Sequence, residues 1–551
     1  MSESGSPVSQ TAAAAPAAPA TPGTATAGVA RSAGLVGIAT MASRLLGLLR
    51  DWVFLTTFGA GHVMDAYNVA FRLPNLVRDL FAEGAMSAAF VPTFTRELHN
   101  KGKEAAWELG RIVITGLIVV TGVITVAGIL LAGPLTAHIA PDYAATPGKL
   151  ELTTTLTQIM FPFLMLIAVA VACMGMLNSL RSFFLPALAP AAFNVVCIAS
   201  AFLIVPFMPA LGWHAMVGLA IGTLLGGVAQ VAVQWPALIK EGFRFRPQLA
   251  FGDPRFREVV RLMIPGTLGL AAAQVNQLVN VYLATSEGEG AVTYLGYAFR
   301  LMYLPIGLFG VSIATAATPA ISRMVAQQDF PRIRSTLANA LGLMMFLNVP
   351  AAVGLIVLAR PIVAVIFEHG EFTASDTIAT AAALQFYAIG LVGYSVVRII
   401  SPTFYALGRS RVPVMVSAGS VVVNILLNVT LVRLMGYRGL ALGTSITAIL
   451  NASVQVYLLR REIHGLEGSR IAASFGRVMV AAAVMGGVSW GAYDTLSGVM
   501  PGDALWTQIG RLLITISVSI AALTAAAQLL RISEYREARD LILGKLRRMS
   551  G

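Results

Sequence analysis

Long uninterrupted apolar segments are the feature that most restricts the fold of this chain. About fourteen segments contain roughly 20 or more mainly apolar residues, and each could cross a bilayer core of about 30 Å as a helix. Hydrophobic residues make up 57% of the chain and charged residues 12%, about half the charged share of a typical soluble domain. The apolar runs do not alternate with polar residues, which favours helices over barrel strands. The sequence therefore predicts an all-α polytopic membrane protein.

The boundaries of the predicted spans follow the apolar runs. They are 33–58, 64–97, 107–138, 152–179, 184–208, 213–239, 256–285, 291–324, 333–368, 374–407, 412–434, 438–461, 471–497 and 504–531. Prolines predict kinks in the second and eighth spans, at Pro74, Pro92, Pro305 and Pro319. Residues 1–30, rich in Ala, Pro, Thr and Ser, are expected to form a disordered cytoplasmic tail. Residues 532–551 are expected to form a basic cytoplasmic tail.

The net charge of +12 is distributed unevenly. Basic residues concentrate in the loops that follow even-numbered spans, with examples at Arg96, Arg181, Arg244, Arg323, Arg409 and Arg460. By the positive-inside rule this pattern places both termini in the cytoplasm. Orientation and attraction to lipid headgroups explain these charges, and they do not indicate a nucleic-acid partner. The two cysteines, Cys173 and Cys197, lie inside apolar spans and form neither a disulfide framework nor a zinc motif.

An internal repeat divides the chain. AFRL occurs at Ala70–Leu73 and again at Ala298–Leu301, and Phe81 and Arg181 fall on Phe309 and Arg409 at the same offset. The repeat predicts two pseudo-symmetric lobes of six spans, 31–240 and 250–465, with the last two spans, 470–531, outside it. Because each copy holds an even number of spans, the symmetry axis should follow the membrane normal, with a cavity between the lobes.

Arginines inside the predicted spans point to an anionic ligand. They are Arg44, Arg50, Arg72, Arg78, Arg300 and Arg398. Each mid-span arginine costs about 2.5–3.5 kcal/mol unless it meets water, a carboxylate or an anion. Few acids share these spans in the second half of the chain, so we expect a net cationic cavity. Arginine suits phosphate because its planar fork makes two charge-assisted hydrogen bonds.

Four sequence blocks carry a resemblance to a known family. They are SRLLGLLRD (43–51), DAYNVAFRLPNLVRDLFAEGAMSAAFVP (65–92), AFRLMYLPIGLFGVSIATAATPAIS (298–322) and FEHGEFTASD (367–376). The chain resembles the MurJ/MviN family over all its predicted spans. The resemblance implies fourteen helices in two lobes and a function as a lipid II flippase in peptidoglycan synthesis. It also implies that the two spans in 470–531 form a groove for the lipid tail.

The resemblance assigns roles to residues of this chain. The positions that match functional or basic positions of the family are Arg44, Arg50, Asp65, Arg78, Glu83, Arg300 and Arg398, and Arg72 joins them as the first AFRL arginine. Many relatives carry a polar residue before the eighth-span arginine, so Phe299 leaves Arg300 without a partner next to it.

A second departure from the family pattern concerns a cation. Many relatives carry an aspartate where this chain has Asn280. Asn280, Asn424, Asn428 and Thr444 could form a polar cation site, or they could only bond helices together.

The expected mechanism is alternating access. Lipid II, whose diphosphate links an isoprenoid tail to a disaccharide-pentapeptide, is expected to pass from the cytoplasmic to the outer leaflet of the bacterial inner membrane. The chain has no GxxxxGK[ST] motif, so the membrane potential is the expected energy source and no cofactor is expected.

Other functions stay open at this point. A flippase for another polyprenyl-diphosphate-linked glycan would use the same arginines. A cation-coupled small-molecule antiporter of the same superfamily would need a cavity lined with acids. A membrane scaffold or an enzyme agrees less well with buried charges and scattered histidines. Lipid II, membrane lipids and cell-wall synthesis proteins are the expected partners.

Overall fold

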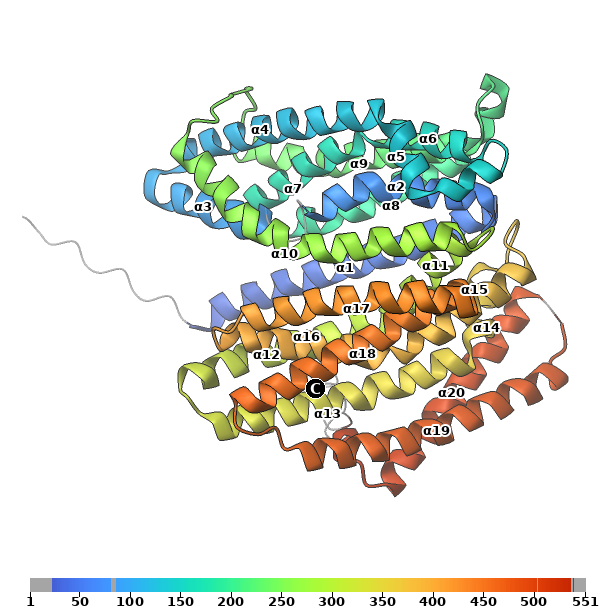
Figure 1. Cartoon of the computed structure of the whole chain (residues 1–551). Helices are drawn as coiled ribbons and strands as arrows, with labels where there is room; N and C mark the ends of the chain where they lie inside the picture. The colour runs from blue at the N-terminus through green and yellow to red at the C-terminus, as the bar shows by residue number, and fades with distance from the viewer. Residues whose placement is uncertain (1–21, 81–85, 503, 537–538, 540–551) are drawn as a thin grey trace, which may run out of the picture.

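The computed structural model describes residues 22–80, 86–502, 504–536 and 539, and every regular element in these ranges is helical (Figure 1). The first lobe contains α1 (Pro22–Phe58), α2 (His62–Leu80), α3 (Met86–Lys101), α4 (Lys103–Leu130), α5 (Ala132–Ile139), α6 (Lys149–Met160), α7 (Phe163–Ser179), α8 (Phe184–Leu203) and α9 (Met216–Lys240), with short 3₁₀ turns η2 (Pro141–Ala145), η3 (Val205–Phe207) and η4 (Pro209–Leu211). The predicted all-α fold is confirmed.

The second lobe begins with α10 and is followed by two further helices. It contains α10 (Pro254–Thr285), α11 (Ala291–Pro305), η5 (Ile306–Gly310), α12 (Val311–Ala326), α13 (Phe330–Val357), α14 (Ala359–Phe367), α15 (Ala374–Ile389), α16 (Leu391–Ala406), α17 (Arg411–Met435) and α18 (Tyr437–Glu462). Helices α19 (Gly468–Val499) and α20 (Leu505–Leu529) pack against each other, and α19 packs against α13. Figure 1 shows the two lobes side by side with α1 and α10 at their boundary.

Within the described residues, ten helical segments are long and apolar enough to cross a membrane, or eleven if the bent pair α15–α16 counts as one span. Each predicted span coincides with one helix or with several consecutive helices. The first, second and seventh predicted spans are not among the segments that are long and apolar enough to cross a membrane. Those spans correspond to α1, α2 with α3, and α10, which carry arginines, carboxylates or amides in their middle turns. Polar residues lower the mean hydropathy of a helix that faces a polar interior, which explains why these three spans are missed. The count of fourteen spans stays a prediction.

The two tails differ from the sequence expectation where the structure describes them. Helix α1 begins at Pro22, so residues 22–30 are helical, and residues 1–21 lie outside the described part. Proline at the first helical position and the alanines that follow explain the early start. After α20 the chain packs back onto the protein: Ile532 and Glu534 are buried. Most of the basic tail, residues 540–551, is outside the described range.

One of the prolines at which the sequence predicts a kink, Pro305, coincides with the end of a helix. Helix α11 ends at Pro305 and continues as the π-helical turn η5 before α12 starts, so the regular α-helix ends at a predicted proline, and a kink there stays a prediction. Proline lacks the N–H group that an uninterrupted helix requires. Among the described residues, one pair of helices, α15 and α16, is bent, by 42° near Gly390.

The hydrophobic cores show how the lobes are joined. We call the end with the α3–α4, α9–α10, α12–α13 and α18–α19 connections the basic end, on the left in Figure 1, and the other the opposite end. One core that includes Phe54, Tyr67, Tyr297 and Phe367 draws on both lobes. Towards the basic end each lobe has its own core, one around Phe94 and Trp107 and the other around Ile333 and Phe404. Helix α10 packs against both α3 and α17.

Candidate functional site

A polar cavity of about 390 Å³ lies between the lobes. Its wall comes from α2, α10, α11, α15, α16 and α18. The polar and aromatic residues that line it are Arg72, Asn75, Asn276, Gln277, Asn280, Phe299, Arg300, Tyr387, Tyr394 and Thr444. Arg72 and Arg300, the arginines of the two AFRL copies, therefore lie on the wall of the same cavity. The repeat places them at equivalent positions of α2 and α11, which face each other across the lobe boundary.

A cluster of two arginines and one carboxylate joins the lobes beside this cavity. Arg50 and Asp51 are consecutive residues of α1, and Arg300 comes from α11. Arg50 Nη2 lies 2.7 Å from Asp51 Oδ1, and Arg300 Nη1 lies 2.5 Å from Asp51 Oδ2. Because two guanidinium groups share one carboxylate, the cluster has a net positive charge. The Arg300 side chain is 44% exposed, whereas that of Asp51 is 6% exposed, so Arg300 can still donate to a ligand.

Aromatic rings hold both arginines in place. Arg300 Cζ lies 4.9 Å from the centroid of the Tyr297 ring. Arg50 Cζ lies 5.8 Å from the Phe54 ring and 5.7 Å from the Phe193 ring. A cation over a ring face is attracted by the ring quadrupole, and the attraction does not consume hydrogen-bond donors. The guanidinium groups are thus oriented before any ligand arrives.

Arg72 belongs to a second polar chain that crosses the lobe boundary. Its Nη2 donates to Gln274 Oε1 of α10 at 3.3 Å, and Gln274 Nε2 donates to Asp79 Oδ2 at 3.5 Å. Arg78 Nη2 donates to Asp79 Oδ1 at 2.8 Å. The Nε group of Arg72 is buried and has no acceptor among the described residues. Arg72, which lines the cavity, therefore has a buried N–H donor that no described acceptor satisfies.

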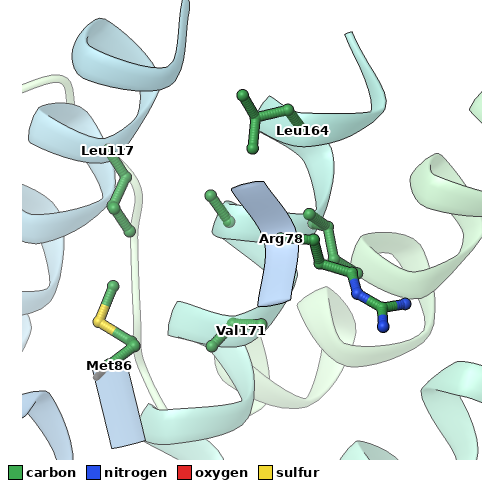
Figure 2. A pocket seen from close by; sticks show the side chains of 7 residues that line it. Arg78, Met86, Leu117, Leu164 and Val171 are labelled. Atoms are coloured by element: carbon green, nitrogen blue, oxygen red, sulfur yellow. The ribbon is translucent and has the colours of Figure 1, made fainter. Parts of the chain in front are cut away.

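Arg78 is not among the residues that line the central cavity. It borders a small apolar hollow with Met86, Leu117, Leu164 and Val171, and Figure 2 shows its guanidinium group pointing away from Met86 and Leu117. Its hydrogen bonds to Asp79 link it to Arg72 through Gln274, so Arg78 belongs to the same series of hydrogen bonds. The structure therefore does not place Arg78 in the cavity wall that we predicted for it.

Asp65 lies in the interface between the lobes towards the opposite end. Asp65 Oδ2 accepts from the Gly290 N–H at 2.8 Å and lies 3.4 Å from Lys149 Nζ. Asp65 Oδ1 accepts from the Thr293 N–H at 3.0 Å and from its hydroxyl at 2.7 Å. These bonds fix the start of α2 to the start of α11. Asp65 is buried and is not among the cavity-lining residues.

Nearby contacts close the same end. The Glu371 N–H donates to the Thr56 carbonyl at 3.0 Å. Glu289 Oε1 accepts from the His62 N–H at 3.0 Å and lies 3.0 Å from His62 Nδ1. These two bonds hold the pKa of Glu289 below its usual range. The opposite end of the cavity is therefore sealed by bonds between the lobes.

Two other predicted residues, Arg44 and Arg398, do not line the cavity, and a third lies outside the described residues. Arg44 is exposed, and its guanidinium group lies against Gly307 of the π-helical turn, where a side chain would collide with it. Arg398 is exposed and donates to the Tyr303 hydroxyl. Glu83 falls in residues 81–85, outside the described part of the chain.

The residues of the predicted cation site form an interhelical amide chain. Asn428 Nδ2 donates to Asn280 Oδ1 at 2.7 Å and to Asn424 Oδ1 at 3.1 Å. Asn424 Nδ2 donates to Thr447 Oγ1 at 3.2 Å. Thr444 donates to its own helix, to the Leu440 carbonyl at 2.7 Å. The contacts match the hydrogen-bonding alternative, and only Asn280 and Thr444 of this set also line the cavity.

An apolar groove of about 490 Å³ lies on the second lobe. It is bounded by α13, α15, α16, α18 and α19, with Val349, Val392, Phe475 and Met479 among its lining residues. Helix α19, from the pair outside the repeat, thus supplies one wall.

Some residues of the site were not predicted. Asp51 follows Arg50 in the sequence, but its bond to Arg300 depends on how the lobes meet. Asn75, Asn276 and Gln277 also line the cavity. The amides crowded into the seventh predicted span, at Gln274, Asn276, Gln277 and Asn280, were the signal that could have identified them.

The fold and site together define a membrane transporter with two related lobes around a polar cavity. A solved inward-facing multidrug resistance MATE transporter has the same fold: the TM-score is 0.66 at 16% identity, covering 77% of this chain and 96% of that one.

The chain belongs to the lipid II flippase MurJ family, whose model matches residues 54–509. It is 35% identical over 500 residues to the probable lipid II flippase MurJ of Bdellovibrio bacteriovorus, covering 90% of this chain and 94% of that protein. It is 34% identical to the lipid II flippase MurJ of Burkholderia cenocepacia, covering 77% and 82% of the two chains. A solved lipid II flippase MurJ in an inward closed conformation matches with a TM-score of 0.73 at 26% identity, over 90% of this chain and 99% of that one.

Proposed function

We propose that the chain moves lipid II across the bacterial cytoplasmic membrane, and that arginines from both lobes bind its diphosphate. The observation that carries this proposal is the meeting of Arg50 and Arg300, from different lobes, on the single carboxylate of Asp51. The cluster keeps a net positive charge beside a cavity that also contains Arg72. An antiporter of cationic drugs would instead need an acidic cavity.

The chemistry of the cluster fits a diphosphate. Each guanidinium group presents five N–H donors in a planar fork and stays charged in a poorly solvated site. Asp51 uses some of these donors and holds the two groups together, while the exposed part of Arg300 remains available. The unused Nε donor of Arg72 would gain an acceptor when the cavity widens around the diphosphate.

The way the lobes are joined supports alternating access. Asp65, Glu289 and Glu371 close the opposite end with bonds between the lobes. Release of the head group on that side requires these bonds to break while the separate cores of the basic end approach each other. We infer that Asp65 is part of a gate and does not contact the substrate.

The apolar groove bounded by α13, α16, α18 and α19 is the place we propose for the isoprenoid tail. Its lining is almost entirely aliphatic or aromatic, so a tail in it would remain in an environment like lipid. The head group could then occupy the cavity while the tail stays in the membrane.

We further infer that both termini face the cytoplasm, because the basic loops lie at one end of the helices. Asn280, Asn424 and Asn428 provide no carboxylate for a coupled cation, which favours the membrane potential as the energy source. Docking of cell-wall synthesis proteins on the cytoplasmic face remains part of the proposal.

The proposal is tested by Arg300→Ala and Arg300→Lys in a strain whose own flippase is depleted. Loss of one charge-assisted hydrogen-bond pair, about 1.5–3 kcal/mol, should lower the rate of lipid II export about tenfold or more. Arg300→Lys should restore lipid II export only weakly, because an ammonium group lacks the planar arrangement of N–H donors of a guanidinium group. Lipid II on each leaflet is measured by protection from an externally added lipid II-cleaving enzyme.

The matched control is Arg360→Ala, which removes an exposed arginine of α14 that does not line the cavity. Protein levels are measured in each strain. Full export with Arg300→Ala at normal expression would refute the diphosphate site. Normal lipid II export after depletion, with loss of another polyprenyl-diphosphate glycan, would instead identify a different substrate.

A further inference from the structure

The connection between α9 and α10 carries an alternating pattern that the transport cycle does not use. The residues are Phe243, Arg244, Phe245 and Arg246. Phe243 is fully buried, with its ring centroid 5.3 Å from that of Trp107 and 5.9 Å from that of Trp235. Phe245 packs edge-on against Trp235 at 5.9 Å. Because the two phenylalanines pack inward, the arginines that alternate with them lie on the outer surface of the first lobe, and both are exposed.

These arginines line a polar cleft of about 440 Å³ together with Arg111 of α4. Gln248 holds the segment against α4, because its N–H donates to Thr115 Oγ1 at 3.0 Å and its side chain to Glu108 at 3.4 Å. The cleft is therefore built from a fixed segment and a helix. It shares no lining residue with the central cavity.

The charges in this cleft are not balanced by the protein. Arg111 Nη2 lies 3.0 Å from Glu104 Oε1, and the Glu104 side chain is 82% exposed. Across the described ranges, Arg244 and Arg246 have neither an ion-pair partner nor a side-chain hydrogen bond. Three arginines thus face one carboxylate, and the cleft carries an excess of about two positive charges. Guanidinium groups whose N–H donors lack protein acceptors are suited to bind phosphate oxygens.

We propose that this cleft binds a phosphate group that is separate from the transported substrate. The cleft lies where α4 and α9 reach the basic end, at the depth of lipid headgroups if these helices cross the membrane. An anionic phospholipid headgroup and a soluble phosphate compound offer the same chemistry, and the experiment distinguishes them.

The test uses the full-length protein with a fluorophore on Pro247→Cys, a lining residue. Both native cysteines are buried, so the new thiol is labelled selectively. One arm titrates inorganic pyrophosphate in neutral detergent. The other compares nanodiscs of phosphatidylcholine with nanodiscs that also contain phosphatidylglycerol. We expect a saturable signal in at least one arm, weakened about tenfold or more by Arg244→Gln with Arg246→Gln, because two charge-assisted contacts are lost.

Arg411→Gln with Arg460→Gln is the matched control, since it removes two exposed charges from the basic end outside the cleft. This pair should change the affinity by no more than about twofold, as expected for diffuse surface electrostatics. A response to pyrophosphate identifies a soluble ligand, and a response only in anionic nanodiscs identifies a lipid. No saturable signal in either arm, or an equal loss in the control pair, would overturn the proposal. Thermal unfolding of each variant verifies that it is folded.

Discussion

At the residue scale, Asp51 decides whether the arginines of the two lobes can lie close together. Its carboxylate is 6% exposed and accepts from Arg50 of its own helix and from Arg300 of the other lobe. Without it, two guanidinium groups would repel each other in a poorly solvated place. With Asp51 between them, the two guanidinium groups can lie close together without a bound ligand, and the group of three side chains keeps a net positive charge. Under the proposed function, Asp51 is therefore part of the anion site, although it has the same sign of charge as the ligand.

Asp51→Asn should lower both stability and transport. The neutral amide leaves Arg50 and Arg300 without their shared counterion, and an uncompensated partly buried charge costs about 1–3 kcal/mol. Thermal unfolding in detergent measures the loss, and a double-mutant cycle with Arg300→Gln should show a coupling of about 1 kcal/mol or more. Asp329→Asn, which removes a carboxylate paired with exposed Arg332 at the surface, should have almost no effect. Additive losses in the cycle would contradict a shared counterion.

At the element scale, glycines allow the two lobes to approach closely at the opposite end. Gly370 has φ of +60°, and a methyl group on it would collide with the Thr56 carbonyl of α1. Gly290 has φ of +83°, and a methyl group on it would lie 2.6 Å from the Ala60 carbonyl. Both contacts are between backbones of different lobes, so relief requires the helices themselves to separate. Glycine is needed here for close approach as well as for its left-handed conformation.

Gly370→Ala should therefore favour opening of the opposite end. Gly148→Ala is the matched control, because Gly148 also has a positive φ of +75° but has open space around its Cα. Both variants have the same kind of backbone strain, about 1 kcal/mol, but only the first has the inter-lobe collision. Spin labels at Asp142 and Ala374, both exposed, measure the separation by double electron–electron resonance. Equal distance distributions in the two variants would show that the contact does not control the gate.

At the scale of the whole molecule, the state described here has one end closed and a cationic cavity between the lobes. The lobes share a core in one region and have separate cores towards the basic end. Under the proposed alternating-access mechanism, a rigid-body rocking motion of the lobes would open the closed end and close the basic end, since packed cores deform little and interfaces can change. The diphosphate would then cross the membrane inside the protein together with its negative charge.

Transport should therefore depend on the membrane potential. A diphosphate with about two negative charges that moves outward through 100 mV gains about 4.6 kcal/mol. In proteoliposomes with a potassium gradient, valinomycin sets the potential, and the rate of lipid II movement should rise when the side that receives the head group is positive. Strong buffering of both sides at one pH, which removes the pH gradient and leaves the potential, should leave the rate unchanged. Transport that follows the pH gradient at zero potential would point to proton coupling.

The sequence predicted the helices and the repeat well, because apolar runs determine the helices and motifs that match at one offset reveal the repeat. Lipid cannot satisfy backbone groups, so long apolar runs must be helical. The two AFRL motifs also correctly indicated that Arg72 and Arg300 face one cavity. The sequence could not predict that Arg78 binds Asp79 behind the cavity wall, or that Asp65 joins the lobes at their interface. Those outcomes depend on contacts between helices that are far apart in the chain.

By itself, the sequence determined a helical membrane protein with two related halves and an excess of arginine in its interior. Lipid as the solvent makes that result almost independent of how the helices pack. Only the tertiary structure decided that Asp51 links Arg50 to Arg300 and that the lobes are closed at the opposite end. Each of these features requires atoms of two lobes within hydrogen-bond distance, and sequence spacing along one helix does not specify that distance.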